Sequence, residues 1–423
     1  MGSEWKNGKL GDHVQIILGG TPRTNEPSYW KGNIPWISVV DFSKDKTIFK
    51  TEKTITKEGL KKSNTKLLGI GDVVISARGT VGKIIVCGIP MAFNQSCYAL
   101  RTKSEELLQN CLYYLIRYNV SYLKKKAIGG VFDTIVMDTL KDLDIILPPL
   151  STQNKIATFL SNYDDLIENN EKRIKILENI TKLLYEEWFV RFKFPGHEKV
   201  KIIDSGTEFR MIPEGWEVKS IMNYENFQFI NTNIKKFNGE KEYFATANVS
   251  GLDILKEGEI VNWSNKPSRA QKEPIINSVW FARMKDSYKV LGITKTKERI
   301  ALNSILSSGF AGFKCEEGIF PFLFLNINSK RFEELKNLYA TGATQVSINN
   351  DGIKNIDIIS PPKDIVEYFG ELINPLLNKL FLLQIKNQNL KKTRDLLLPK
   401  LISGEIDVSD LDIQLNRVLE QNG

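Results

Sequence analysis

The chain has 423 residues, of which 42% are hydrophobic and 26% are charged. These fractions are typical of a globular protein and argue against a disordered chain, and the length suggests two or three domains. The 58 Lys and Arg residues outnumber the 50 Asp and Glu residues, giving a net charge of +8 that weakly favours a polyanionic partner.

Several classes of protein are excluded by features of the whole chain. The segment from Met1 to Leu10 is polar, whereas a secretory signal has an apolar core. The sequence contains no run of 18 apolar residues, so we expect no membrane-spanning helix. The cysteines Cys87, Cys97, Cys111 and Cys315 are dispersed, which fits a reducing cytoplasm and predicts no disulfide framework. Because the chain has only two histidines, we expect neither a metal site nor histidine-based catalysis.

Three segments of the first 150 residues favour contact with nucleic acid. One is a glycine-containing loop, one is a glycine-rich turn after the strand expected at 72–78, and one is rich in amides. Glycines let a backbone approach phosphates closely, Arg can bind guanine through two hydrogen bonds, and Asn or Gln can read adenine. The candidates are Gly19, Gly20, Thr21, Pro22, Arg23, Thr24, Asn25, Arg78, Gly79, Thr80, Lys83, Asn94, Gln95 and Ser96. Each segment alone is equally compatible with an ordinary turn, and the basic run 124–126 with a solvated surface.

The sequence from Ala127 to Pro149 is repeated 213 residues later, from Ala340 to Pro362. The two stretches align without a gap, and ten of their 23 positions are identical. Residues of ordinary composition would match at about one or two positions. We therefore expect an internal repeat.

Each repeat continues into a long helix with a coiled-coil pattern. The seam positions step alternately by four and three residues over four heptads, a period of 3.5. The predicted seam contains Ile156, Leu160, Ile167, Asn170, Ile174, Leu177, Leu184 and Trp188 in the first helix, and Ile373, Leu380, Asn387, Leu390 and Leu397 in the second. The single Asn in each seam can fix the register. An alternative is that the two helices pack on separate cores.

A second globular unit precedes the second helix. The strands expected at 243–249 and 278–283 correspond to those at 34–42 and 72–78. Its candidate contact residues are Asn231, Thr232, Asn233, Arg283, Lys285, Ser287, Lys289, Thr344 and Gln345. The expected boundaries are 1–150 for the first recognition domain, 151–196 for the first helix, 197–212 for a polar linker, 213–362 for the second domain, 363–404 for the second helix and 405–423 for an acidic tail. Phe194-Pro195-Gly196 should end the first helix.

Motifs for catalysis are missing from the sequence. The two diprolines lie in LPPL and SPPK, so neither forms the (D/N)PP(Y/F) loop of an adenine methyltransferase. The turn from Ala77 to Ile84 resembles a phosphate-binding loop, but Ala77 replaces its first glycine and Ile84 its Ser or Thr. We therefore expect no enzymatic activity and no cofactor in this chain.

The chain resembles the DNA specificity subunits of type I restriction–modification systems. The motifs that carry the resemblance are GGTPRT from Gly19, PWISVVDF from Pro35, GDVVISARGTVGK from Gly71, FNQS from Phe93, KDLDIILPPLSTQNKIA from Lys141, TGATQ from Thr341 and LLLPKLISGEID from Leu396. They follow one another over nearly the whole chain. The second unit lacks a GGTP loop, and the first has Gly129-Gly130-Val131-Phe132 in place of a GxTQ loop.

The resemblance implies an α+β fold in which two mixed α/β target-recognition domains are joined by two long helices that form an antiparallel coiled coil, as a pseudo-twofold repeat. It implies that each domain reads one half of a split site in double-stranded DNA. It also implies a cytoplasmic complex with two methyltransferase and two restriction/translocase subunits, with S-adenosylmethionine, ATP and Mg²⁺ bound only by those partners.

Two other functions remain open, a fused methyltransferase–specificity enzyme and a structural coiled-coil scaffold. For the DNA-reading function, the distance from Ile156 to Trp188 is about 48 Å along a helix, which corresponds to about 14 base pairs. The repeat also predicts that residues 1–196 alone would form a twofold dimer and select an inverted repeat.

Overall fold

The structure is a computed structural model that describes residues 5–42, 45–127 and 134–408. The loop 129–132 and most of the acidic tail lie outside these residues. Two compact units are formed, one by 1–169 with 389–423 and the other by 170–388. No helix among the described residues combines the length and apolarity needed to cross a bilayer.

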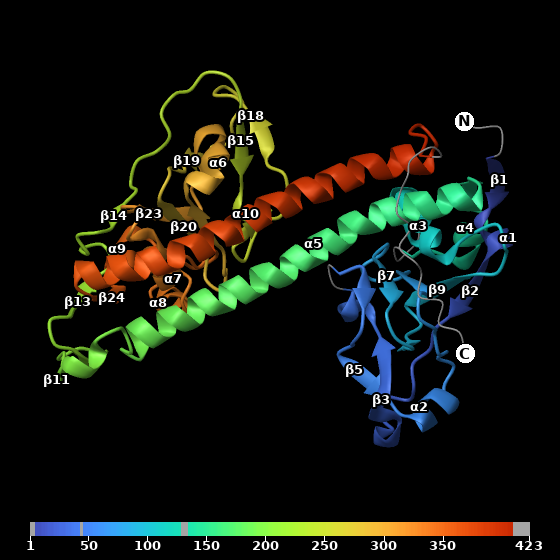
Figure 1. The fold of residues 1–423 in the computed structure, drawn as a ribbon, viewed down its shortest axis with the longest axis horizontal. Coiled ribbons are helices and arrows are strands. Elements are labelled where there is room, and N and C mark those ends of the chain that lie inside the picture. The colour runs from blue at the N-terminus through green and yellow to red at the C-terminus, as the bar shows by residue number, and fades with distance from the viewer. Residues whose placement is uncertain (1–4, 43–44, 128–133, 409–423) are drawn as a thin grey trace. The chain divides into compact units, whose positions relative to one another are not determined.

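The first unit contains two main sheets, coloured blue to cyan in Figure 1. The larger has the strand order β2 (Val14–Leu18), β9 (Cys97–Thr102), β6 (Val73–Ser76), β7 (Ile84–Cys87) and β4 (Thr47–Ile48), and the smaller β5 (Lys53–Ile55), β3 (Trp30–Ile37) and β8 (Ala92–Phe93). A separate pair is formed by β1 (Lys6–Lys9) and β10 (Asp144–Leu147). The helices are α1 (Leu10–His13), α2 (Lys57–Lys61), α3 (Gln109–Ala127) and α4 (Met137–Lys141). The core lies between α3 and the larger sheet, where Leu112 and Ile116 are buried with Val73 and Leu100.

The second unit has two four-stranded sheets. Their orders are β14 (Gln228–Phe229), β23 (Phe310–Lys314), β20 (Ser278–Ala282), β21 (Val290–Ile293), and β18 (Glu259–Val261), β15 (Lys241–Phe244), β22 (Ser304–Ser307), β19 (Ala270–Lys272). The two-stranded pairs are β13 (Glu217–Ser220) with β24 (Asp357–Ser360), β16 (Val249–Ser250) with β17 (Asp253–Ile254), and β11 (Ile202–Asp204) with β12 (Met211–Pro213). The helices are α6 (Glu298–Asn303), α7 (Phe320–Ile327), α8 (Lys330–Leu338) and α9 (Asn350–Lys354). Its core is rich in phenylalanine, and α7 contributes Phe320, Phe322 and Phe324.

The two units share a strand order. The order β2-β9-β6-β7 corresponds to β14-β23-β20-β21. The sheets that contain β3 and β15 also correspond, because each of these strands pairs antiparallel on one side and parallel on the other: β3 with β5 and β8, and β15 with β18 and β22. The strands predicted at 72–78 and 278–283 are β6 and β20. The strand predicted at 34–42 forms only as far as residue 37, the end of β3, and a 3₁₀ turn follows at 39–41. The strand predicted at 243–249 begins with the last two residues of β15, and a 3₁₀ turn at 246–248 interrupts it.

Two long helices follow the diprolines, as predicted. They are α5 (Leu150–Tyr185) and α10 (Lys363–Ile402), and every predicted seam residue is buried or half-buried. The expected end of the first helix near Phe194 is too late, because α5 gives way to a π-helical turn at Glu186–Val190. The segment 197–212, predicted to be a polar linker, contains β11 and the start of β12.

Within the second unit, α5 and α10 run antiparallel. The Nδ2 atom of Asn170 donates to Oδ1 of Asn387 at 2.8 Å, whereas at the other end of this stretch the Trp188 ring lies 5.3 Å from that of Phe369. Residue numbers therefore rise along one helix as they fall along the other. In the first unit, Ile156 and Leu160 share a core with Leu398 and Leu401.

A buried lysine connects the second globular unit to α10. The Nζ atom of Lys297 donates to Oε1 of Gln384 at 2.9 Å and lies 4.5 Å from the centre of the Phe381 ring. Burial lowers the pKa of Lys297 to about 8, because a low-dielectric environment disfavours the ammonium.

We predict that Lys297 makes folding stability depend on pH. Between pH 8 and 10.5 the folded-state lysine loses its proton before the unfolded-state lysine does, so the folded state gains stability as the pH rises. The stability of the wild type relative to Lys297→Met should therefore increase by about 2–3 kcal/mol from pH 7 to pH 10. Denaturant unfolding at several pH values measures this difference. The exposed neighbour Lys295, changed to Met, should give no such dependence, and parallel curves for wild type and Lys297→Met would contradict the prediction.

Candidate nucleic-acid interface

In the first unit, the structure brings the predicted glycine-containing loop against the amide-rich segment. The Oγ1 atom of Thr21 donates to Oε1 of Gln95, and the Gly20 amide donates to the Phe93 carbonyl at 3.0 Å. A Cβ at Gly19 would lie 2.1 Å from the backbone oxygen of Asn94. Glycine is therefore required here for the two segments to approach each other.

The predicted glycine-rich turn joins these two segments. Backbone amides of Ala77 and Arg78 donate to the Ser96 carbonyl at 2.8 and 3.2 Å. Gly79 and Gly82 have φ values of +75° and +79°, a conformation that favours glycine. The turn is closed at Ser76, whose Oγ accepts from the Lys83 amide at 2.9 Å. The three predicted segments of the first unit thus form one surface.

This surface presents exposed positive charge. The residues exposed on it are Arg23, Thr24, Asn25, Arg78, Gly79, Thr80, Lys83 and Gln95, whereas Gly19, Thr21, Asn94 and Ser96 are half-buried and Gly20 and Pro22 are buried. Within the described part of the chain, no carboxylate lies within ion-pair distance of Arg23, Arg78 or Lys83. Lys124 is also near, because a Cβ at Gly82 would contact its side chain at 2.6 Å.

The second unit also brings its predicted segments together. The loop that holds Thr344 and Gln345 joins Arg283–Lys285 through the Lys285 amide, which donates to the Val346 carbonyl at 3.0 Å. A Cβ at Gly342, where φ is +126°, would lie 2.6 Å from the Gln345 carbonyl oxygen. Exposed side chains on this surface come from Asn231, Thr232, Asn233, Lys285, Thr344 and Gln345.

Hydrogen bonds within the protein also engage the predicted residues Arg283, Ser287 and Lys289. The guanidinium of Arg283 donates to the Ile348 carbonyl at 3.1 Å and to Oδ1 of Asn350 at 2.7 Å, and burial lowers its pKa. Lys289 donates to the Thr246 carbonyl at 2.6 Å, and the Ser287 carbonyl accepts from Lys336 at 3.0 Å. Arg283 and Lys289 therefore hold loops in place within this surface.

Two polar residues near this surface were not predicted from sequence. Asn350 donates to Oδ1 of Asn231 at 3.4 Å and so links that loop to Arg283. Lys272 donates to Oδ1 of Asn233 at 3.1 Å, and burial lowers its pKa. Neither lies in a glycine-rich segment, and no local pattern distinguishes them from other polar residues.

The chemistry of the two surfaces follows from their exposed groups. Among the described residues, no three His, Cys, Asp or Glu side chains are placed to hold a metal ion. The exposed groups are cations, amides, threonine hydroxyls and glycine backbone, all of which can form hydrogen bonds to phosphates or base edges.

Comparison with known proteins identifies similar chains. The model of the type I restriction modification DNA specificity domain matches residues 2–179. The type I restriction enzyme MjaIX specificity subunit of Methanocaldococcus jannaschii is 30% identical over 419 residues, which cover 96% of this chain and 95% of that protein. The MjaVIII specificity subunit of the same organism is 23% identical, with 97% and 94% covered.

A solved structure has a similar fold. The S subunit of the type I restriction–modification system from M. genitalium superposes with a TM-score of 0.61 at 14% sequence identity. The match covers 95% of this chain and 97% of that chain.

Proposed function

Because this chain belongs to the type I restriction enzyme specificity subunits and supplies DNA sequence specificity, we propose that it reads a two-part, asymmetric DNA site. Each globular unit reads one part through the surface described above. The observation that carries the proposal is the exposed Arg78 on a glycine-rich turn that is hydrogen-bonded to Ser96, beside Gln95. The second surface offers Lys285, Gln345 and asparagines, so the two units should read different bases.

The proposed domains are two recognition domains at 1–150 and 213–362, each followed by a long helix, α5 with its π-helical turn to Val190 and α10. The shared strand order and the 213-residue spacing of β10 and β24 support an internal repeat. The antiparallel contacts of α5 and α10 within the second unit support a coiled coil. In this proposal, the paired helices set the distance between the two parts of the site.

The chain is proposed to act without catalysis of its own, in a cytoplasmic complex. Two methyltransferase subunits and two restriction/translocase subunits would supply the chemistry and bind S-adenosylmethionine, ATP and Mg²⁺. Exposed apolar residues along the second-unit part of the helix, Ile176, Ile180, Leu183 and Val190, are consistent with a protein partner. A methylation assay on the chain alone distinguishes this from a fused enzyme, which would be active without partners.

The proposal is tested by selecting sites from random DNA with the chain bound to its methyltransferase subunits. We expect two short blocks of sequence separated by unread bases. Arg78→Ala should weaken binding of the complete site by about 1–3 kcal/mol, or about 5- to 150-fold, and relax preference in one block only.

A matched control is Lys61→Ala, which removes an exposed cation on α2 that belongs to none of the three predicted segments. It should leave both blocks unchanged. A single continuous block in the wild type, or equal relaxation of both blocks by Arg78→Ala, would argue against two separate readers.

A further inference from the structure

Two buried polar pairs connect α5 with α10, one in each unit. In the first unit, Oδ1 of Asp164 lies 2.6 Å from Nη1 of Arg394, and the two side chains are only 6% and 10% exposed. In the second unit, Asn170 donates to Asn387 at 2.8 Å, and both residues are buried. These pairs place polar groups in an interface that is otherwise mostly apolar.

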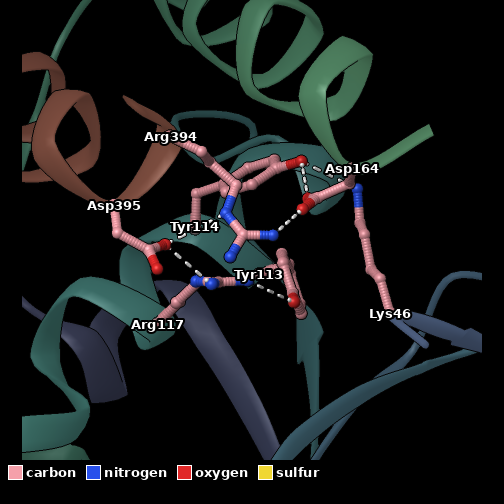
Figure 2. Close-up of polar contacts among 7 residues, drawn as sticks. All are labelled: Lys46, Tyr113, Tyr114, Arg117, Asp164, Arg394 and Asp395. Atoms are coloured by element: carbon pink, nitrogen blue, oxygen red, sulfur yellow. Dashed lines mark hydrogen bonds and ion pairs between the residues drawn. The ribbon is translucent and has the colours of Figure 1, made fainter. Parts of the chain in front are cut away.

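The charged pair is embedded in a larger network in the first unit (Figure 2). The hydroxyl of Tyr114 on α3 donates to Oδ2 of Asp164 at 2.7 Å. Arg394 also contacts Asp395 at 3.0 Å, and Arg117 donates to Asp395 at 2.9 Å. Burial opposes the charge on Arg394, but its carboxylate partners raise its pKa overall. Asp164 thus accepts from two donors, one on α3 and one on α10.

The offset of 213 residues identifies which residues would face each other if a helix paired with a second copy of itself. The residue that corresponds to Arg394 is Thr181, and the one that corresponds to Asn387 is Ile174. In a pair of first helices with the same register, Asp164 would therefore face Thr181 and Asn170 would face Ile174. The Asp164 carboxylate would then have no cation opposite it, and the Asn170 side chain would have no amide opposite it.

The corresponding positions on the other helix are also unsuited to polar partners. Asp164 corresponds to Leu377 and Asn170 to Leu383, and both leucines are buried. In a pair of second helices, Arg394 and Asn387 would face these leucines. Thr181 is buried as well, and its hydroxyl donates to the Leu177 carbonyl of its own helix at 2.9 Å, so it needs no partner across the interface.

We propose that these two pairs make the halves of the chain recognise each other and reject copies of themselves. A buried charge or amide without a partner is strongly unfavourable, whereas the matched pair is tolerated. Single polar residues in helix interfaces are known to select partners in this way. The homodimer expected from the sequence for residues 1–196 is therefore disfavoured.

The consequence for DNA reading rests on the proposed function. The pairing keeps two different recognition domains on one pair of helices. It disfavours a helix pair that carries two copies of one domain, which would read an inverted repeat. The pairing itself does not depend on DNA and can be measured without it.

The test uses the folded full chain, cut once at a protease site placed in the exposed turn Ser205–Arg210 between β11 and β12. The two pieces have different masses, so native mass spectrometry separates unlike from like pairs. Mixing ¹⁵N-labelled with unlabelled cut protein, with warming if needed, verifies that pieces exchange. In the wild type we expect unlike pairs in at least about tenfold excess over a random mixture.

Two substitutions should remove the discrimination. Ile174→Asn with Thr181→Arg gives the first helix the groups that Asn170 and Asp164 require, so like pairs of the first piece should increase at least about tenfold. Ile174→Asn alone should produce a smaller increase. The control is Ile176→Asn with Leu183→Arg, which adds the same residue types at exposed positions of α5 and should leave the ratio of like to unlike pairs unchanged.

A random mixture of pairs in the wild type would overturn the proposal. So would an equal rise in like pairs with the control substitutions. Either result leaves the two-part reading of DNA untouched, because that is measured separately by site selection.

Discussion

Replacing Arg394 with leucine should lower the free energy of unfolding of the first unit by about 3–5 kcal/mol. The substitution leaves the Asp164 carboxylate buried with only the Tyr114 hydroxyl as a donor. Removing one member of a buried ion pair is costly because the remaining charge is neither solvated nor neutralised. Hydrogen-exchange protection of the α3 amides reports on this unit without interference from the second.

Two further variants show whether the loss comes from the pair. Lys386→Ala removes an exposed cation from the same helix and should change stability by less than about 0.5 kcal/mol. Asp164→Leu with Arg394→Thr installs the residues found at Leu377 and Thr181, and it should recover most of the loss. If Arg394→Leu lowers the free energy of unfolding no more than Lys386→Ala does, the Asp164–Arg394 pair does not stabilise the contact between the helices.

The long helices and their buried faces could be predicted from sequence because their signals are local. A diproline precedes each helix, and the 3.5-residue period identifies which positions are buried. The runs that form β6 and β20 are likewise short and apolar. The end of α5 was misplaced because Phe194-Pro195-Gly196 is a strong stop signal, whereas nothing in the local pattern indicates the π-helical turn before it.

Contacts between distant residues could not be predicted in this way. Asn170 and Asn387 were each expected to fix register, but they are not equivalent under the 213-residue offset, so their pairing emerges only when the helices are set antiparallel. Arg283 and Lys289 lie in the segment between β20 and β21 and are predicted from sequence to contact DNA. Their sequence context does not reveal that carbonyls of Ile348 and Thr246 lie within reach.

Lengthening both helices by one heptad should change the site that the complex selects. Seven residues with the seam pattern are inserted between Asn169 and Asn170 in α5 and between Gln388 and Asn389 in α10. These points face each other in the register set by Asn170 and Asn387, and they leave the contacts within each unit intact. The inserts add about 10 Å of helix and, because seven residues are nearly two turns, rotate one end by only about 20°.

The measurement that tests the central claim most directly is the number of unread bases between the two blocks of the selected site. With the lengthened helices, we expect this gap to grow by about three base pairs, while the two blocks keep their sequences and the original spacing is no longer selected. A seven-residue insert between Gly206 and Thr207 adds residues outside the helices and should leave the gap unchanged. An unchanged gap in the protein with lengthened helices would contradict the account that α5 and α10 set the distance between two DNA-reading units.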